Sequence, residues 1–153
     1  MNLWPVESPV AVVRRRWRDR HGALDPGAKI GVRGEQAAAR LLRKKGLVVI
    51  RTGYRDWGGE LDIIAVHRWR KTVVFVEVKS TASSKPGHPA DRVTEDKQRR
   101  VAAAATRFMK KKRILGMPAR FDVVAVWWPE GLAEPEKIEH YEAAFESPLE
   151  SFW

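Results

Sequence analysis

The hairpin at the centre of this chain is encoded by residues 58–79, which read GGELDIIAVHRWRKTVVFVEVK. Two apolar runs rich in β-branched residues flank a charged segment, and this pattern predicts two antiparallel strands. A four-residue turn over 68–71 would set His67 opposite Thr72. The apolar runs carry four charged residues: Glu60, Asp62, Glu77 and Lys79. Because buried charges are costly without partners, these four residues are the first candidates for a functional site.

Strand periodicity predicts how these four residues are arranged. Side chains alternate between the two faces of a strand, so Glu77 and Lys79 share one face. The register set by the turn continues to Asp62 opposite Glu77 and to Glu60 opposite Lys79. Directly opposed residues have Cβ atoms about 4.5–5.5 Å apart, so two carboxylates are expected to meet on the sheet.

A carboxylate pair of this kind needs a counter-charge. Unit charges about 4 Å apart interact by roughly 4 kcal/mol at an effective dielectric constant near 20, and Lys79 offsets only part of that repulsion. A divalent cation would offset more, and oxygen ligands without cysteine suit Mg²⁺ or Mn²⁺. The alternative is an ordinary cross-strand cluster of ion pairs made by the same four residues.

Residues 34–45, GEQAAARLLRKK, predict a helix that Gly46 ends. Glu35 falls on the same side of this helix as the apolar Ala38 and Leu42. One interpretation directs Glu35 at the sheet, beside the hairpin carboxylates. The other makes it an exposed first-turn acid that the helix dipole favours.

A second helix is predicted to begin after Thr94, a suitable N-cap, and to end in the basic segment 110–113. Lys97 lies on its apolar stripe and is expected to point inward. Three basic residues share another face and are candidate nucleic-acid contacts, with simple solvation as the alternative: Arg100, Arg107 and Lys111.

The remaining pattern predicts the element order helix, three strands, helix, strand. Residues 47–52 favour a strand, residues 53–59 a turn-rich link, and 119–128 a strand buried on both faces. Asp122 in that strand is given a structural role, paired with Arg120 or another basic residue. The segment IEHYEAAF, 138–145, is compatible with an edge strand or a short helix. This order indicates an α/β sheet with a meander and a helical crossover.

Charge divides the 153 residues into three parts. Residues 1–29 are interpreted as a mobile basic arm, 30–128 as the α/β domain and 129–153 as an acidic tail. The middle part holds 22 basic and 9 acidic residues, whereas the last part holds 1 and 7. A basic body favours binding to a polyanion such as nucleic acid, although a basic domain without such a partner remains the alternative. The chain has no cysteine and no apolar run of about 18 residues, so we expect a cytoplasmic protein without a membrane partner.

Asp62 followed by Glu77-Val78-Lys79 resembles the PD-(D/E)xK signature of restriction-endonuclease-like nucleases, with Leu61 where the signature has proline. A fuller resemblance is to the YraN family of predicted nucleases. It rests on GEQAAARLL, GELDIIA, VFVEVK, Lys97 and RFDVVAV, and covers about residues 31–127. Archaeal Holliday-junction resolvases look similar in arrangement, with an acid in the first helix.

The resemblance implies an αβββαβ core, a central mixed sheet with helices on both faces. It also implies that Asp62 and Glu77 hold Mg²⁺ (or Mn²⁺) with the Val78 carbonyl, and that Glu35 completes the site or supports a second ion. Lys79 would orient or activate the attacking water and stabilise charge on the phosphate. Glu60 and Lys97 are second-tier candidates for the site.

The expected function is a metal-dependent endonuclease acting on DNA rather than RNA, including branched or repair intermediates. The resemblance to junction resolvases alone suggests a homodimer. A non-catalytic nucleic-acid-binding module of the same fold is the main alternative. The acidic tail and seven tryptophans also leave a protein-interaction scaffold open.

Overall fold

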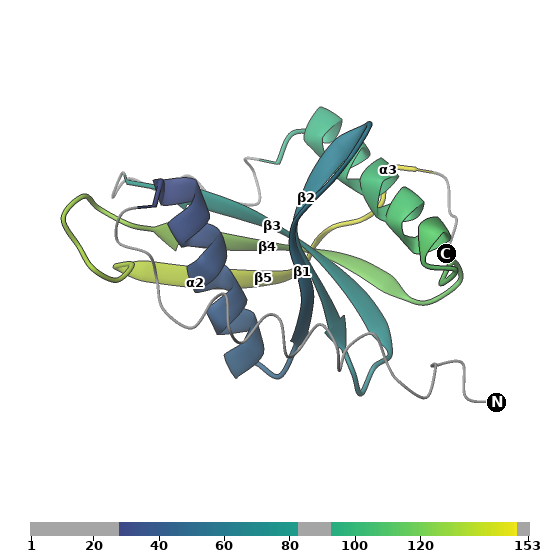
Figure 1. Ribbon diagram of the computed structural model, residues 1–153, viewed down its shortest axis with the longest axis horizontal. Helices are drawn as coiled ribbons and strands as arrows, with labels where there is room; N and C mark the ends of the chain where they lie inside the picture. Colours follow the sequence, from purple (N-terminus) through teal and green to yellow (C-terminus); the bar gives the residue numbers. More distant parts are fainter. Residues whose placement is uncertain (1–27, 83–92, 150–153) are drawn as a thin grey trace.

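The computed structural model describes residues 28–82 and 93–149 as one mixed five-stranded sheet with two helices (Figure 1). The elements in chain order are α2 (Ile30–Lys44), β1 (Val48–Asp56), β2 (Gly59–His67), β3 (Thr72–Thr81), α3 (Glu95–Lys111), β4 (Ala119–Trp127) and β5 (Lys137–Phe145). Nearly all of the basic arm predicted for residues 1–29 lies outside these residues. Within them, no helix is both long and apolar enough to cross a membrane.

The strands lie in the order β1-β2-β3-β4-β5. The first three form an antiparallel meander, while β3 and β4 are parallel and are joined through α3. This arrangement confirms the α/β fold with the restriction-endonuclease-like αβββαβ core. β5 pairs with β4 in antiparallel fashion and forms an edge of the sheet, so the segment 138–145 is a strand and not a helix.

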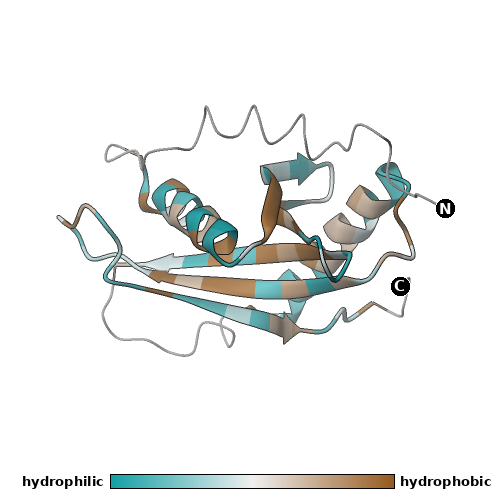
Figure 2. Ribbon diagram, turned by 90° about the horizontal axis from the view of Figure 1, so that it is seen from below, coloured by the Kyte–Doolittle hydropathy of each residue, from teal (hydrophilic) through white to brown (hydrophobic). Residues whose placement is uncertain are grey.

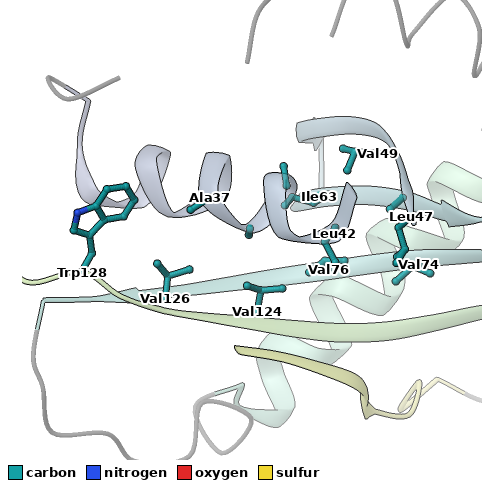
Figure 3. Close-up of a cluster of buried hydrophobic side chains, with 13 residues drawn as sticks. Ala37, Leu42, Leu47, Val49, Ile63, Val74, Val76, Val124, Val126 and Trp128 are labelled. Atoms are coloured by element: carbon teal, nitrogen blue, oxygen red, sulfur yellow. The ribbon is translucent and has the colours of Figure 1, made fainter. Parts of the chain in front are cut away.

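Each helix covers one face of the sheet. Alternation along β3 directs Val74 and Val76 into a cluster beneath α2, and Val73 and Phe75 into a cluster beneath α3. Figure 3 shows the first cluster, in which Leu42 of α2 lies over valines of β3 and β4. Hydrophobic residues concentrate in the middle of the strands, beneath the helices (Figure 2). Two separate layers of apolar packing therefore hold β3 and β4 in the centre.

The hairpin of β1 and β2 bends away from β3 toward α3 (Figure 1). β1 continues to Asp56, so the turn-rich link predicted for residues 53–59 is mostly strand; Gly53, at φ +59°, bends it without ending it. The register of His67 opposite Thr72 is as predicted, but the ladder between β2 and β3 stops at Ile63 and Val76. Beyond that pair the two strands separate.

Helix α2 begins at Ile30, four residues before the predicted start at Gly34. Gly34 lies inside the helix because α2 packs closely on β3 there: a Cβ at this position would meet the Ser80 Oγ at 1.8 Å. The helix ends as predicted before Gly46, which has a φ of +85°. The close contact at Gly34 brings the second turn of α2 next to the end of β3.

Candidate functional site

Glu77 is the buried acid at the point where β2 and β3 separate. Its side chain is 4% exposed, and alternation places it on the α3 side of β3, beyond Phe75. Its Oε1 lies 3.2 Å from the Lys79 Nζ and 3.3 Å from the Lys97 Nζ. Lys97 therefore points inward from α3 as predicted, and Thr94 caps that helix by accepting a hydrogen bond from the Lys97 amide at 3.3 Å. Two lysines from different elements fix the Glu77 carboxylate.

Asp62 reaches β3 through its side chain. The expected backbone pairing opposite Glu77 is absent from the ladder, and the Val78 amide instead donates a hydrogen bond to the Asp62 Oδ2 at 2.8 Å. Burial, followed by the negative charge of Glu77, raises the pKa of Asp62 to about 7. The charge of Glu35 adds to this rise, while the Val78 amide and Lys97 oppose it. Among the described residues Asp62 forms no ion pair, so its charge is only partly compensated.

Glu35 lies half-buried in the second turn of α2. The helix starts at Ile30 and has no acidic residue in its first turn, so the interpretation of Glu35 as a first-turn acid is wrong. Burial, then the charges of Glu60 and Glu77, raise the pKa of Glu35, while Arg55 lowers it. The carboxylate of Glu35 on α2 therefore interacts electrostatically with the acidic residues of β2 and β3.

Glu60 does not face Lys79, contrary to the register expected from the turn. It pairs with Arg55 across the β1–β2 ladder, and the Arg55 Nε lies 3.2 Å from the Glu60 Oε2. The reason is the bend of the hairpin, which carries Glu60 away from β3 together with the tip. Glu60 is 47% exposed and stands at the edge of the cluster.

The geometry suits a hard cation held by two carboxylates. Asp62 and Glu77 approach from separate strands, and their mutual repulsion is the chemical reason that a cation would be favoured between them. In residues 28–82 and 93–149, no three His, Asp or Glu side chains converge as a metal-binding group. A site for Mg²⁺ commonly uses one or two carboxylates plus water and substrate phosphate, so Asp62 and Glu77 are the residues that could hold such an ion.

The three basic residues expected on one face of α3 differ in their surroundings. Arg100 is exposed and lines a pocket beside the hairpin tip, and Lys111 is exposed at the end of the helix. Arg107 is not free for phosphate: its Nε and Nη2 donate to the two Asp56 carboxylate oxygens at 2.6 and 2.8 Å. Arg100 and Lys111 keep the predicted availability, whereas Arg107 holds the hairpin.

The sequence did not predict that the turn between β1 and β2 lies close to the site. Trp57 in this turn is 89% exposed, and the Arg107 guanidinium lies 4.7 Å from the centre of its ring. The sequence signal was the DWGG segment, residues 56–59, whose glycines suggested only a turn. The contact with Arg107, 50 positions further along the chain, is a tertiary feature without a local signature.

Asp122 has the structural role predicted for it. It is 0% exposed, and Arg120 donates to it at 3.0 Å. The His140 Nε2 lies 2.8 Å from its Oδ2, and the amide of Ala143, in the bulge of β5, donates to its Oδ1 at 2.9 Å. Burial raises the pKa of Asp122, but the hydrogen bonds from His140, Ala143 and Arg120 outweigh that effect and hold it below its usual range.

Comparisons with known proteins identify the family of this chain. The model of the Uncharacterised protein family UPF0102 matches residues 34–126. A UPF0102 protein of Rhodopirellula baltica is 51% identical over 142 residues, which cover 91% of this chain and 85% of that protein. A UPF0102 protein of Geotalea uraniireducens is 43% identical over 117 residues, or 76% of this chain and 89% of that protein. The chain belongs to family UPF0102, the YraN family that its motifs resemble.

Proposed function

We propose that this protein is a metal-dependent endonuclease that hydrolyses phosphodiester bonds in DNA, including branched or repair intermediates. The observation that carries this proposal is the electrostatic interaction of Asp62 with Glu77 where β2 separates from β3, with Lys79 and Lys97 paired with Glu77. An acid pair beside a lysine is the set of groups that phosphodiester hydrolysis needs. The basic surface of the domain supports a polyanionic substrate.

In this mechanism Asp62 and Glu77 would hold Mg²⁺ (or Mn²⁺), with the Val78 carbonyl as a further ligand. Glu35, which forms no three-acid group with them among the described residues, would support the site through its negative charge. The ion, when bound, supplies a Lewis acid that neutralises charge on the phosphate oxygens. Lys79 orients the attacking water and stabilises the negative charge that develops on the phosphate. Lys97 fixes the Glu77 carboxylate from α3, so the helix and the sheet together orient it.

The test offers the purified protein labelled duplex, single-stranded and four-way-branched DNA, and RNA, with Mg²⁺, with Mn²⁺ or with EDTA. Glu77→Gln is expected to lower the rate of metal-dependent cleavage by about 100-fold or more. The matched control is Glu134→Gln, which removes an exposed acid paired with Arg40 at 3.4 Å and should change the rate by less than about twofold. If Glu77→Gln retained metal-dependent cleavage, the residues around Glu77 would be excluded as the catalytic site.

A second candidate is a non-catalytic nucleic-acid-binding module, and the two lysines that already neutralise Glu77 favour it. This function predicts binding that weakens steeply as salt rises, because phosphate contacts release counterions. Such binding would be indifferent to Mg²⁺ and to Glu77→Gln. Binding of this kind without cleavage of any substrate would select the second candidate.

A further inference from the structure

Trp57 is an unusually exposed tryptophan. Tryptophan is largely buried on average in folded proteins, yet this ring is 89% exposed at the tip of the β1–β2 hairpin. Trp69, in the β2–β3 turn, is 93% exposed, so exposure alone does not distinguish the two rings. The difference is that the Arg107 guanidinium lies over Trp57, 4.7 Å from the ring centre. In the part of the chain that the structure describes, Trp69 has no such contact.

The turn that carries Trp57 is rigidly held. The Asp56 Oδ1 accepts a hydrogen bond from the Gly58 amide at 2.9 Å, and both oxygens of the same carboxylate bind Arg107. Gly58 permits this arrangement, because a Cβ there would lie 2.9 Å from the Arg107 Nη2. The ring is therefore presented by a fixed turn, with most of its surface open. A preorganised aromatic surface loses little conformational entropy when a ligand binds.

A pocket of about 380 Å³ lies between this turn and α3. Its lining includes Gly58 and Gly59, and Arg100 and Lys97 of α3. The two acids in the lining, Asp56 and Glu60, are each paired with an arginine. Lys97 is the lysine that contacts Glu77 at 3.3 Å. Arg100 has no ion-pair partner within residues 28–82 and 93–149, so its charge is available to a phosphate. The volume is at the small end of ligand pockets, which suits one nucleotide and not a duplex.

We propose that Trp57 stacks on an unpaired base while Arg100 and Lys97 contact its backbone, so that the substrate class is DNA with unstacked bases near the cleaved bond. This inference rests on the proposed function and extends it to the substrate. A base inside a continuous duplex has both faces stacked on its neighbours and offers none to Trp57. Single strands, gaps, flaps and junctions offer a free face, and stacking on aromatic side chains tolerates any sequence.

The experiment measures binding of fluorescein-labelled DNA by anisotropy in EDTA, so that it does not depend on cleavage. Two ligands of the same sequence are compared, a continuous duplex and a duplex with a short single-stranded gap. Trp57→Ala should weaken binding of the gapped DNA by about 10-fold and of the duplex by less than twofold. Trp57→Phe, which keeps an aromatic ring, should restore most of the affinity. Trp69→Ala, the matched control, should not discriminate between the two ligands.

A direct readout places 2-aminopurine at the unpaired position. Its fluorescence should be quenched on binding the native protein and Trp57→Phe, but not Trp57→Ala. If Trp57→Ala changed the affinity for both ligands equally, or for neither, the inference would be overturned. The second result would indicate that Trp57 contacts a protein partner and not DNA. Circular dichroism verifies that each variant is folded, and Trp57→Phe supplies the comparison if Trp57→Ala is not.

Parallel cleavage assays with Mg²⁺ separate the two proposals. Cleavage that needs Glu77 but does not respond to the gap or to Trp57→Ala would retain the nuclease and remove the stacking role. Gap-selective binding through Trp57 without cleavage of any DNA would retain the stacking role and remove the nuclease.

Discussion

Two acids in the same sheet, Asp62 in β2 and Asp122 in β4, have opposite surroundings. Asp122 receives hydrogen bonds from Arg120, His140 and the Ala143 amide, and its pKa lies below the usual range. Asp62 has one amide and a neighbouring carboxylate, and its pKa is raised to about 7. The opposite pKa shifts indicate that Asp122 stabilises the fold, whereas the charge of Asp62 is available to a cation or another binding partner.

The largest expected effect comes from the compensated acid. Asp122→Asn should lower the free energy of unfolding by about 3–5 kcal/mol at pH 7, because it removes the buried charge that compensates Arg120 and leaves that cation only its exposed pair with Glu142. Urea denaturation measures the change. The folded-state pKa of Asp122 is lowered, so its contribution is present above its ordinary pKa and disappears as the pH falls below about 4. A loss under about 1 kcal/mol at pH 7 would show that Asp122 is not the structural acid.

Neutralising Asp62 is expected to raise the free energy of unfolding, in contrast to Asp122. Asp62→Asn removes the charge and keeps an oxygen for the Val78 amide, so the metal-free protein should gain about 1–3 kcal/mol at pH 8. The folded-state pKa of Asp62 is raised, so ionisation costs stability increasingly from about pH 4 to pH 7, and the cost is constant above that range. Urea denaturation in EDTA at pH 4.5 and pH 8 measures both limits. A gain that does not grow with pH would contradict the assignment.

Addition of Mg²⁺ extends the same comparison without a measurement of activity. At about 100 times its dissociation constant, an ion that binds only the folded state stabilises it by roughly 2.7 kcal/mol, or about 5–10 °C in melting temperature for a chain of this size. The native protein should show this shift, whereas Asp62→Asn and Glu77→Gln should not. NaCl at matched ionic strength is the control. An equal shift in Asp62→Asn would place the ion elsewhere.

The contrast between the two acids shows what the sequence could and could not predict. Alternation and the turn length gave Glu77 beside Lys79 and the register of His67, because both depend on local geometry. A structural role for Asp122, paired with Arg120 or another basic residue, was also predicted, and Arg120 is one of its partners. His140 was not predicted as its partner, because IEHYEAAF was compatible with two structures until its packing against β4 was known.

The Asp62 site depends on tertiary contacts that periodicity does not encode. The separation of β2 from β3 accompanies a positive φ at Gly53 and the contact of the hairpin tip with α3 through Asp56 and Arg107. The helix α2 starts before Gly34, and Gly34 is the residue at which α2 lies closest to Ser80 of β3, so this glycine serves a close contact and not a helix start. A glycine in a sequence is compatible with a turn, a helix end or a close contact, and only the partner decides among them.

The smallest effect is expected at Glu60, two residues from Asp62 in the same strand. Its pair with Arg55 is exposed, so Glu60→Gln should change the free energy of unfolding by less than about 1 kcal/mol at any pH. The pKa of Glu35 should nevertheless fall toward its ordinary value, since the charge of Glu60 helps to raise it, and an NMR titration of the side-chain carboxylates measures this. A gain in stability as large as that of Asp62→Asn would mean that the uncompensated charge is spread along the whole hairpin. The different stabilities at Asp62 and Asp122 would then reflect two regions of the sheet and not two individual acids. Asp62 would no longer be identified as a specific metal ligand.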